Sequence, residues 1–183
     1  MQAVILSERA LGDTDGLFTA AVEHIARKLG RVKPLAADSL PADRAGKLAA
    51  LDAWAGSDID WRGELIRFYE DHIPLHLRPN PGLNAALRAL QSRGVRIGCW
   101  SDGPEEAARI VVHHLGLARR VEEVAAGGPE AVAALVAALG ARPVGSVMVT
   151  RDERELAVAA ELGLATAGPD ELAALAADTA VPG

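Results

Sequence analysis

A short apolar run, Ala3–Leu6, opens the chain almost at its first residue and ends abruptly at Ser7, Glu8 and Arg9. An apolar run of this length, followed by polar residues and then by a helical pattern, is typical of a buried parallel strand. In open α/β sheets, ligands bind at the carboxyl ends of the strands. We therefore expect Ser7, Glu8 and Arg9 to lie at the floor of any site that this protein has.

The chain that follows this strand is helical in pattern until residue 75. Helices are predicted from about 16 to 29, from 41 to 55 and from 60 to 72, and these segments hold most of the aromatic residues. Residues 14–75 are thus predicted to form a small all-helical module inserted after the first strand. We interpret its larger aromatic residues as the core of this module, with the lining of a ligand cavity as the alternative: Trp54, Trp61, Phe68 and Tyr69.

From residue 79 onward, helical and strand patterns alternate. Strands are predicted at 95–100, 121–124, 146–149 and 164–167, with a helical segment between each pair. Such alternation indicates right-handed βαβ crossovers and a parallel sheet with helices on both faces. The expected fold class is α/β, with a Rossmann-like parallel sheet core formed by residues 1–13 and 76–183 and the helical module formed by residues 14–75.

Composition argues against several classes of partner. Hydrophobic residues make up 50% of the chain, which is enough for a substantial core, and the net charge of −6 disfavours nucleic acid and anionic membrane surfaces. The chain has no apolar run of 18 residues and no signal-peptide pattern at its start. A single cysteine, Cys99, allows neither an internal disulfide nor a cysteine-based zinc cluster. We expect a cytoplasmic protein that binds neither nucleic acid nor membranes.

Three segments, in this order and at this spacing, carry a family resemblance. They are Val4–Leu6 with Asp13–Phe18, then Arg78–Gly82 with Leu87–Asp102, and finally Val147–Val149 with Glu155–Gly163. Together they resemble the haloacid dehalogenase-like superfamily, in the phosphoglycolate-phosphatase-like branch that has a helical cap after the first strand. The resemblance covers residues 3 to about 168 and implies the same α/β core with residues 14–75 as the cap.

The resemblance also implies a chemistry. In this family the first strand ends in Asp-x-Asp-x-Thr, where the first aspartate attacks phosphorus and the second protonates the leaving oxygen. A Ser or Thr and a Lys hold the phosphate, and an acidic motif helps to bind Mg²⁺. A carboxylate nucleophile gives a hydrolysable acyl phosphate, and the metal offsets the like charges of carboxylate and phosphate. The resemblance therefore implies a magnesium-dependent phosphatase.

In this chain other residues stand at the positions of the first aspartates and the lysine. Ser7 takes the place of the nucleophile, Arg9 that of the acid–base aspartate, and Ala126 that of the phosphate-binding lysine. An arginine cannot deliver and recover a proton near neutral pH. We therefore predict that the aspartate chemistry of the family is lost.

The acidic motif is altered as well. Thr150 and Arg151 replace its Gly-Asp, Asp152 follows one residue later, and Glu155 replaces its second aspartate, while the middle motif survives as Ser101-Asp102. An arginine within about 4 Å of a divalent cation would be repelled by several kcal/mol at an effective dielectric of roughly 20. We therefore predict that Mg²⁺, although expected for the family, is not bound and that the protein has no cofactor.

The two arginines allow two interpretations. In the first, Arg9 and Arg151 replace the metal and bind an anion, aided by Ser101 and the N-terminus of the following helix. In the second, they pair with Glu8, Asp102, Asp152 or Glu155 and fill a vestigial pocket. We favour the second interpretation because inward-facing arginines normally need carboxylate partners. The candidate ligand-binding residues are Ser7, Arg9, Ser101, Asp102, Arg151, Asp152 and Glu155.

Three functions remain open. The favoured one is a non-catalytic relative, a pseudo-phosphatase, that binds a small anionic ligand or a protein partner. The second is an active hydrolase of the same family, acting on a small phosphorylated metabolite with rearranged acids, for which Asp13, Asp102 and Asp152 are the candidates. The third is a purely structural or interaction role, for example as a homodimer.

Overall fold

The structure, a computed structural model, describes residues 1–178 and divides into two compact units. The α/β unit comprises Met1–Gly12 together with the described residues from Arg78 onward, and the helical unit comprises Asp13–Leu77. The predicted module 14–75 overlaps the helical unit, and residues 179–183 of the predicted range 76–183 lie outside the described residues. No helix within residues 1–178 combines the length and the apolar character needed to cross a membrane.

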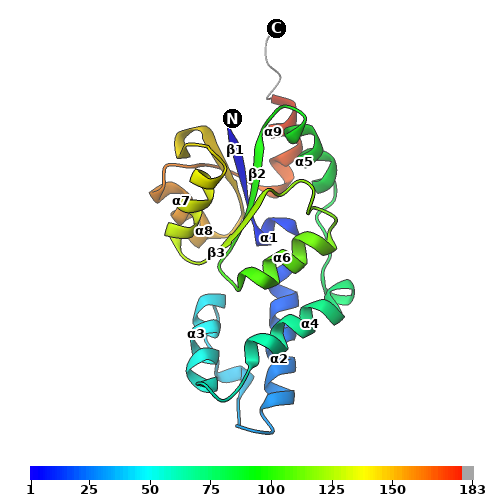
Figure 1. Cartoon of the computed structure of the whole chain (residues 1–183), viewed down its shortest axis with the longest axis vertical. Coiled ribbons are helices and arrows are strands. Elements are labelled where there is room, and N and C mark those ends of the chain that lie inside the picture. The colour runs from blue at the N-terminus through cyan, green and yellow to red at the C-terminus, as the bar shows by residue number, and fades with distance from the viewer. Residues whose placement is uncertain (179–183) are drawn as a thin grey trace. The chain divides into compact units, whose positions relative to one another are not determined.

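The α/β unit is built on a parallel sheet of five strands in the order β3-β2-β1-β4-β5 (Figure 1). The strands are β1 (Ala3–Ser7), β2 (Arg96–Ser101), β3 (Glu123–Ala126), β4 (Ser146–Val149) and β5 (Ala165–Ala167). The central strand β1 pairs with both neighbours, so that Val4 lies opposite Ile97 and Val147. The predicted α/β fold class is confirmed, and the strand expected at 121–124 lies two residues further along.

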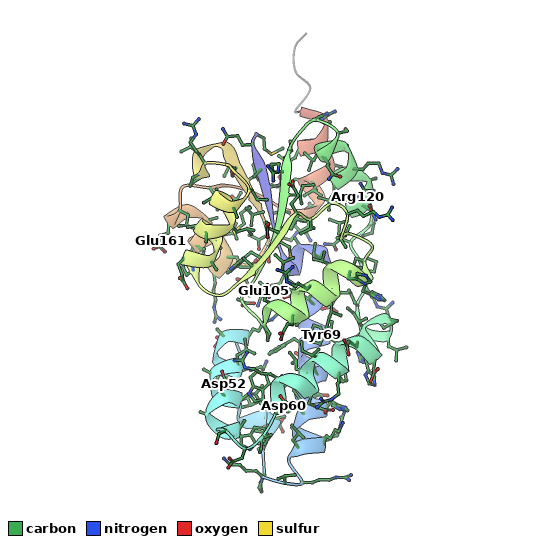
Figure 2. The ribbon with its side chains drawn as sticks, viewed as in Figure 1. Asp52, Asp60, Tyr69, Glu105, Arg120 and Glu161 are labelled. Carbon is green, nitrogen blue, oxygen red and sulfur yellow. The ribbon has the colours of Figure 1, made fainter. Side chains whose placement is uncertain are left out.

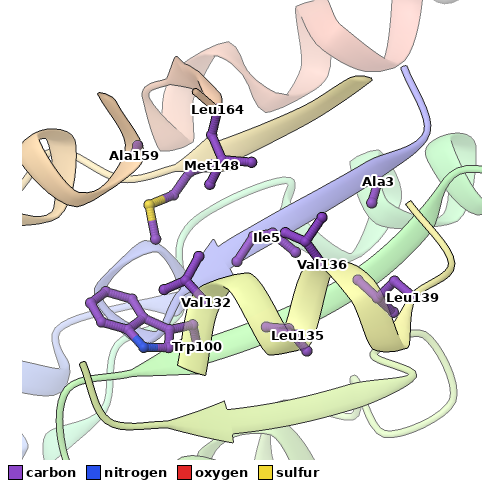
Figure 3. Close-up of a cluster of buried hydrophobic side chains, with 10 residues drawn as sticks. All are labelled: Ala3, Ile5, Trp100, Val132, Leu135, Val136, Leu139, Met148, Ala159 and Leu164. Atoms are coloured by element: carbon purple, nitrogen blue, oxygen red, sulfur yellow. The ribbon is translucent and has the colours of Figure 1, made fainter. Parts of the chain in front are cut away.

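Helices lie on both faces of this sheet (Figure 1). They are α5 (Leu83–Gln91), α6 (Glu105–His114), α7 (Pro129–Ala138), α8 (Glu153–Glu161) and α9 (Leu172–Asp178), with single turns η2 (Pro143–Gly145) and η3 (Pro169–Glu171). Figure 3 shows one interface, where Val132, Leu135 and Val136 of α7 face Ile5 and Met148 of the sheet. This interface buries apolar side chains from β1 and β4 together.

Trp100 belongs to the same apolar cluster, although it directly precedes Ser101 (Figure 3). Its side chain is buried, and its indole Nε1 donates a hydrogen bond of 3.1 Å to the carbonyl oxygen of Gly127. Gly127 has a φ of 125°, a conformation that residues with a side chain rarely adopt. The indole therefore holds the turn after β3 against the sheet and is part of the core.

The segment after β1 is a short helix, α1 (Glu8–Leu11), where the sequence predicts a loop. Ser7 begins this helix, because its side-chain oxygen accepts a hydrogen bond from the amide of Arg9 at 3.2 Å. Ala10 and Leu11 are buried, which favours the compact turn over an extended loop. The turn carries Glu8 and Arg9 directly past the carboxyl end of the strand.

The helical unit contains α2 (Thr14–Leu29), α3 (Arg44–Ala55) and α4 (Trp61–His76), with one turn of 3₁₀-helix, η1 (Ala37–Ser39). Each long helix begins after an aspartate that accepts a hydrogen bond from the amide of a glycine three residues later. The pairs are Asp13 with Gly16 at 2.9 Å, Asp43 with Gly46 at 2.8 Å and Asp60 with Gly63 at 2.8 Å; Figure 2 labels Asp60. A Cβ at any of these glycines would crowd the capping carboxylate, which accounts for the repeated Asp-x-x-Gly spacing.

The aromatic side chains of this unit divide into two groups. Trp61, Phe68 and Tyr69 are buried, as expected of core residues. Trp54 is half-buried, and its Nε1 donates a hydrogen bond of 3.1 Å to the carbonyl oxygen of Pro34. Trp54 therefore fastens the loop before α3 and is not enclosed in the core.

Candidate functional site

Three hydroxyl groups lie at the carboxyl edge of the sheet. Ser7 and Ser101 end β1 and β2, and Thr150 directly follows β4. Since the three strands are parallel neighbours, their ends meet at one edge. All three residues are at most 2% exposed. The edge at which the sequence predicts a site therefore holds buried hydroxyl groups at the ends of the three central strands, β2, β1 and β4.

The guanidinium of Arg9 connects two carboxylates at this edge. Its Nη1 lies 2.5 Å from Oε1 of Glu155, and its Nη2 lies 3.0 Å from Oδ2 of Asp102. The side chain of Arg9 is 17% exposed, that of Asp102 is 25% exposed and that of Glu155 is 4% exposed. One arginine thus joins the turn after β1 to the loop after β2 and to the first turn of α8.

Glu155 is the most enclosed member of this group. Besides Arg9, its carboxylate accepts hydrogen bonds from the hydroxyls of Thr150 and Ser7. Burial raises the pKa of Glu155, and the hydrogen bonds from Ser7 and Thr150, together with the charge of Arg9, only partly oppose that rise. Both hydroxyls are thus engaged with a carboxylate of the protein itself.

Glu8 also lies at this edge and, like Thr150, is missing from the candidate ligand-binding residues that the sequence indicated. It is 2% exposed, and its Oε2 accepts a hydrogen bond from the hydroxyl of Ser101, whose oxygen in turn accepts the amide of Gly103 at 2.9 Å. The signal that could have identified Glu8 is its position, because it is a charged residue directly after a fully buried strand. The hydroxyl of Ser101 is therefore engaged with a carboxyl group of the protein itself.

Arg151 does not join this group. Its guanidinium pairs with Asp170, and both side chains are about two-thirds exposed, at 67% and 68%. The expectation that Arg151 pairs with Glu8, Asp102, Asp152 or Glu155 is therefore wrong. Thr150 turns inward, and its Oγ1 accepts the amide of Asp152 at 3.0 Å, so the residue between them projects to the opposite side of the extended chain.

The acids named for a rearranged active site each have a structural partner. Asp13 caps α2 in the helical unit. Asp152 caps α8, where it accepts hydrogen bonds from the amides of Arg154 and Glu155 at 3.0 and 3.2 Å. Asp102 pairs with Arg9. Of these three acids, Asp102 is the one that the structure brings into the group around Arg9.

The comparisons with known proteins agree on one family. Residues 6–163 match the family model of the haloacid dehalogenase-like hydrolases. Phosphoglycolate phosphatase from Rhodospirillum rubrum is 33% identical over 118 residues, which cover 58% of this chain and 49% of that protein. Haloacetate dehalogenase H-2 from Moraxella sp. is 37% identical over 62 residues, which cover 34% of this chain and 27% of that protein. The chain thus spans about half or less of the length of these two relatives.

Solved structures agree on the fold. The structure of CbbY from Rhodobacter sphaeroides in complex with phosphate is similar, with a TM-score of 0.72 and 14% identity over 92% of this chain and 85% of that one. A HAD phosphatase from Thermococcus onnurineus has a TM-score of 0.66 and 19% identity over 91% of this chain and 85% of that one. At these identities the likeness extends to the architecture alone.

Proposed function

Because the chain belongs to the haloacid dehalogenase-like hydrolase family, we propose that it is a member that has lost phosphate-ester hydrolysis and uses the family framework for binding. The observation that carries this proposal is the guanidinium of Arg9, held between Asp102 and Glu155 at the end of β1. A family phosphatase would need a proton-donating carboxylate at the position of Arg9. A permanently charged guanidinium cannot exchange a proton there.

Ser7 is a poor substitute for the nucleophile. A serine attacks phosphorus or carbon when a neighbouring base activates it and when the substrate can reach it. Ser7 has no exposed surface, its oxygen accepts the amide of Arg9, and its hydroxyl bonds to Glu155. These contacts support a structural role for Ser7 as the cap of α1.

Magnesium does not fit the residues at this edge. Mg²⁺ needs carboxylate oxygens that are available to it and an octahedral shell completed by water. Here the oxygens of Asp102 and Glu155 that face the site bond to Arg9, which also places a positive charge where the ion would stand. We therefore propose that the protein functions without this metal.

The proposal is tested by hydrolysis of p-nitrophenyl phosphate and 2-phosphoglycolate, the second chosen because a phosphoglycolate phosphatase is among the relatives. The purified protein should release phosphate no faster than a protein-free blank, with Mg²⁺ or with EDTA. The double variant Ser7→Asp/Arg9→Asp tests whether these two positions alone block the chemistry. Arg96→Asp makes the same Arg→Asp substitution as at position 9, but at the first residue of β2, and serves as the control for that substitution. Turnover by the unmodified protein that EDTA abolishes would refute the proposal and favour an active phosphatase.

We propose the binding partner by its chemical class. A small anionic ligand, a protein partner and a second copy of the chain are the alternatives that the family framework leaves open, and a cytoplasmic location without nucleic acid or membrane partners is part of the same proposal. Thermal shifts with phosphate and sugar phosphates test the anion, and light scattering tests the homodimer. The pairing of Arg151 with Asp170, away from Arg9, argues for a weaker anion site than two converging arginines would make.

A further inference from the structure

We propose that Arg9 is a built-in cation, which neutralises Asp102 and Glu155 in place of a metal and excludes divalent ions from the edge of the sheet. The inference rests on the proposed function and extends it. The two contacts of 2.5 and 3.0 Å use separate nitrogens of one guanidinium, so a single cation serves two carboxylates from different elements. A bridging metal ion would contact two carboxylates in the same way, and here the guanidinium of Arg9 takes that role.

A guanidinium suits this task for two physical reasons. Its planar fork presents several N–H donors in fixed directions, so it can bond to two carboxylates at once. It also keeps its charge at every pH at which the protein folds, and it cannot dissociate from the chain. The positive charge between Asp102 and Glu155 is therefore independent of the ions in solution.

The surrounding charges explain why a cation is needed. Glu8, Asp102 and Glu155 contribute three carboxyl groups to this edge, and the guanidinium of Arg9 bonds to two of them. A carboxylate that is buried and loses its partner becomes strongly destabilising. Without Arg9, the two ion pairs that join the turn after β1 to the loop after β2 and to α8 would be lost.

Removal of Arg9 should therefore create the binding site that its side chain fills. In Arg9→Ala, Asp102 and Glu155 would share the space of the missing guanidinium, and Mg²⁺ is often held by one or two carboxylates with water completing its shell. Asp102 is 25% exposed, which gives the ion a route from solvent. The variant should bind Mg²⁺ or Mn²⁺, whereas the unmodified protein should bind neither at this edge.

The experiment measures the thermal midpoint in EDTA, in MgCl₂, in MnCl₂ and in NaCl of equal ionic strength. The unmodified protein should change by less than about 1 °C between EDTA and either divalent salt. Arg9→Ala should melt lower in EDTA and regain about 2–4 °C in the divalent salts but not in NaCl. Arg9→Gln is a milder second variant that keeps the measurement possible where Arg9→Ala does not fold.

Two controls locate the effect. Arg96→Ala removes an arginine from another ion pair, with Glu122 at 2.5 Å, and should gain nothing from the metals. The triple variant Arg9→Ala/Asp102→Asn/Glu155→Gln lacks the carboxylates and should also gain nothing.

The inference is overturned where Mg²⁺ stabilises the unmodified protein as much as the Arg9 variant, or where a folded Arg9 variant does not respond to either metal. Hydrolysis by the unmodified protein without any thermal response to Mg²⁺ would refute the proposed function alone. The two proposals can therefore fail separately.

Discussion

Glu64 on α4 offers a quantitative test of what stabilises the helical unit. Its side chain is 3% exposed and accepts hydrogen bonds from Lys28 Nζ at 2.6 Å and from Arg67 Nη2 at 2.9 Å, and its Oε1 lies 2.8 Å from Nε2 of His24. His24 and Lys28 belong to α2, whereas Arg67 lies one turn along α4. The single buried carboxylate therefore joins the two longest helices of the unit, and Glu64→Gln should weaken that connection.

The size of the effect follows from the pKa of Glu64. Burial acts to raise this pKa, but the hydrogen bonds from Lys28, His24 and Arg67 outweigh it and lower the pKa from 4.5 to about 2. Such a lowering corresponds to about 3 kcal/mol of folding free energy. Because the side chains of Lys28 and Arg67 are each 55% exposed, solvent screening reduces the expected loss in Glu64→Gln to about 2 kcal/mol.

The sign of the pH dependence is also determined. The pKa of Glu64 in the folded protein lies below its value of 4.5 in the unfolded chain, so the folded state favours the ionised form. The stabilisation is therefore fully present above pH 4.5 and is lost as the pH falls towards about 2. The difference in free energy of unfolding between the unmodified protein and Glu64→Gln should shrink over that interval.

Urea denaturation followed by tryptophan fluorescence measures this difference. A Trp100→Phe background leaves Trp54 and Trp61, both in the helical unit, as the reporters. Glu70→Gln makes the same chemical change at an exposed position of α4 and should alter the free energy of unfolding by less than about 0.5 kcal/mol. The reasoning is refuted if Glu64→Gln is as mild as Glu70→Gln at neutral pH, or if its effect is the same at about pH 3.

Three further predictions concern the α/β unit. Gly98→Ala should destabilise the protein by about 1 kcal/mol in chemical denaturation, because its Cβ would stand 3.0 Å from methyl carbons of Leu135 and Leu139; an unchanged midpoint would show that these side chains yield freely. Asp152→Ala should cost about 1 kcal/mol through loss of the cap of α8, with Asp152→Asn retaining most of the stability, and equal losses in both would contradict a capping role. Burial raises the pKa of the Cys99 thiol, so Ellman's reagent should react with it only after unfolding, and rapid labelling of the native protein would contradict the packing around β2.

The prediction of the fold succeeded where the signal was local. The apolar run at 146–149 coincides with β4, and the alternation of helices and strands was sufficient for a parallel sheet. The predicted position of β3 was wrong by two residues. The segment that contains Val121 and Val124 is short, and its polar residues obscure the strand pattern. The turn at Glu8–Leu11 was missed because the polar residues from Ser7 onward were interpreted as a loop, and Ser7 was not recognised as the cap of a helix.

The sequence by itself determined which residue types stand at the carboxyl edge of the sheet, and it placed both Arg9 and Arg151 there. Only the tertiary structure decided which arginine points inward. Arg9 reaches Glu155, 146 residues along the chain, whereas the inward turn of Thr150 directs Arg151 outward to Asp170. Periodicity reports the neighbours of a residue along its own helix or strand. The partner of a buried charge depends on which distant segments the packed sheet brings within hydrogen-bonding distance.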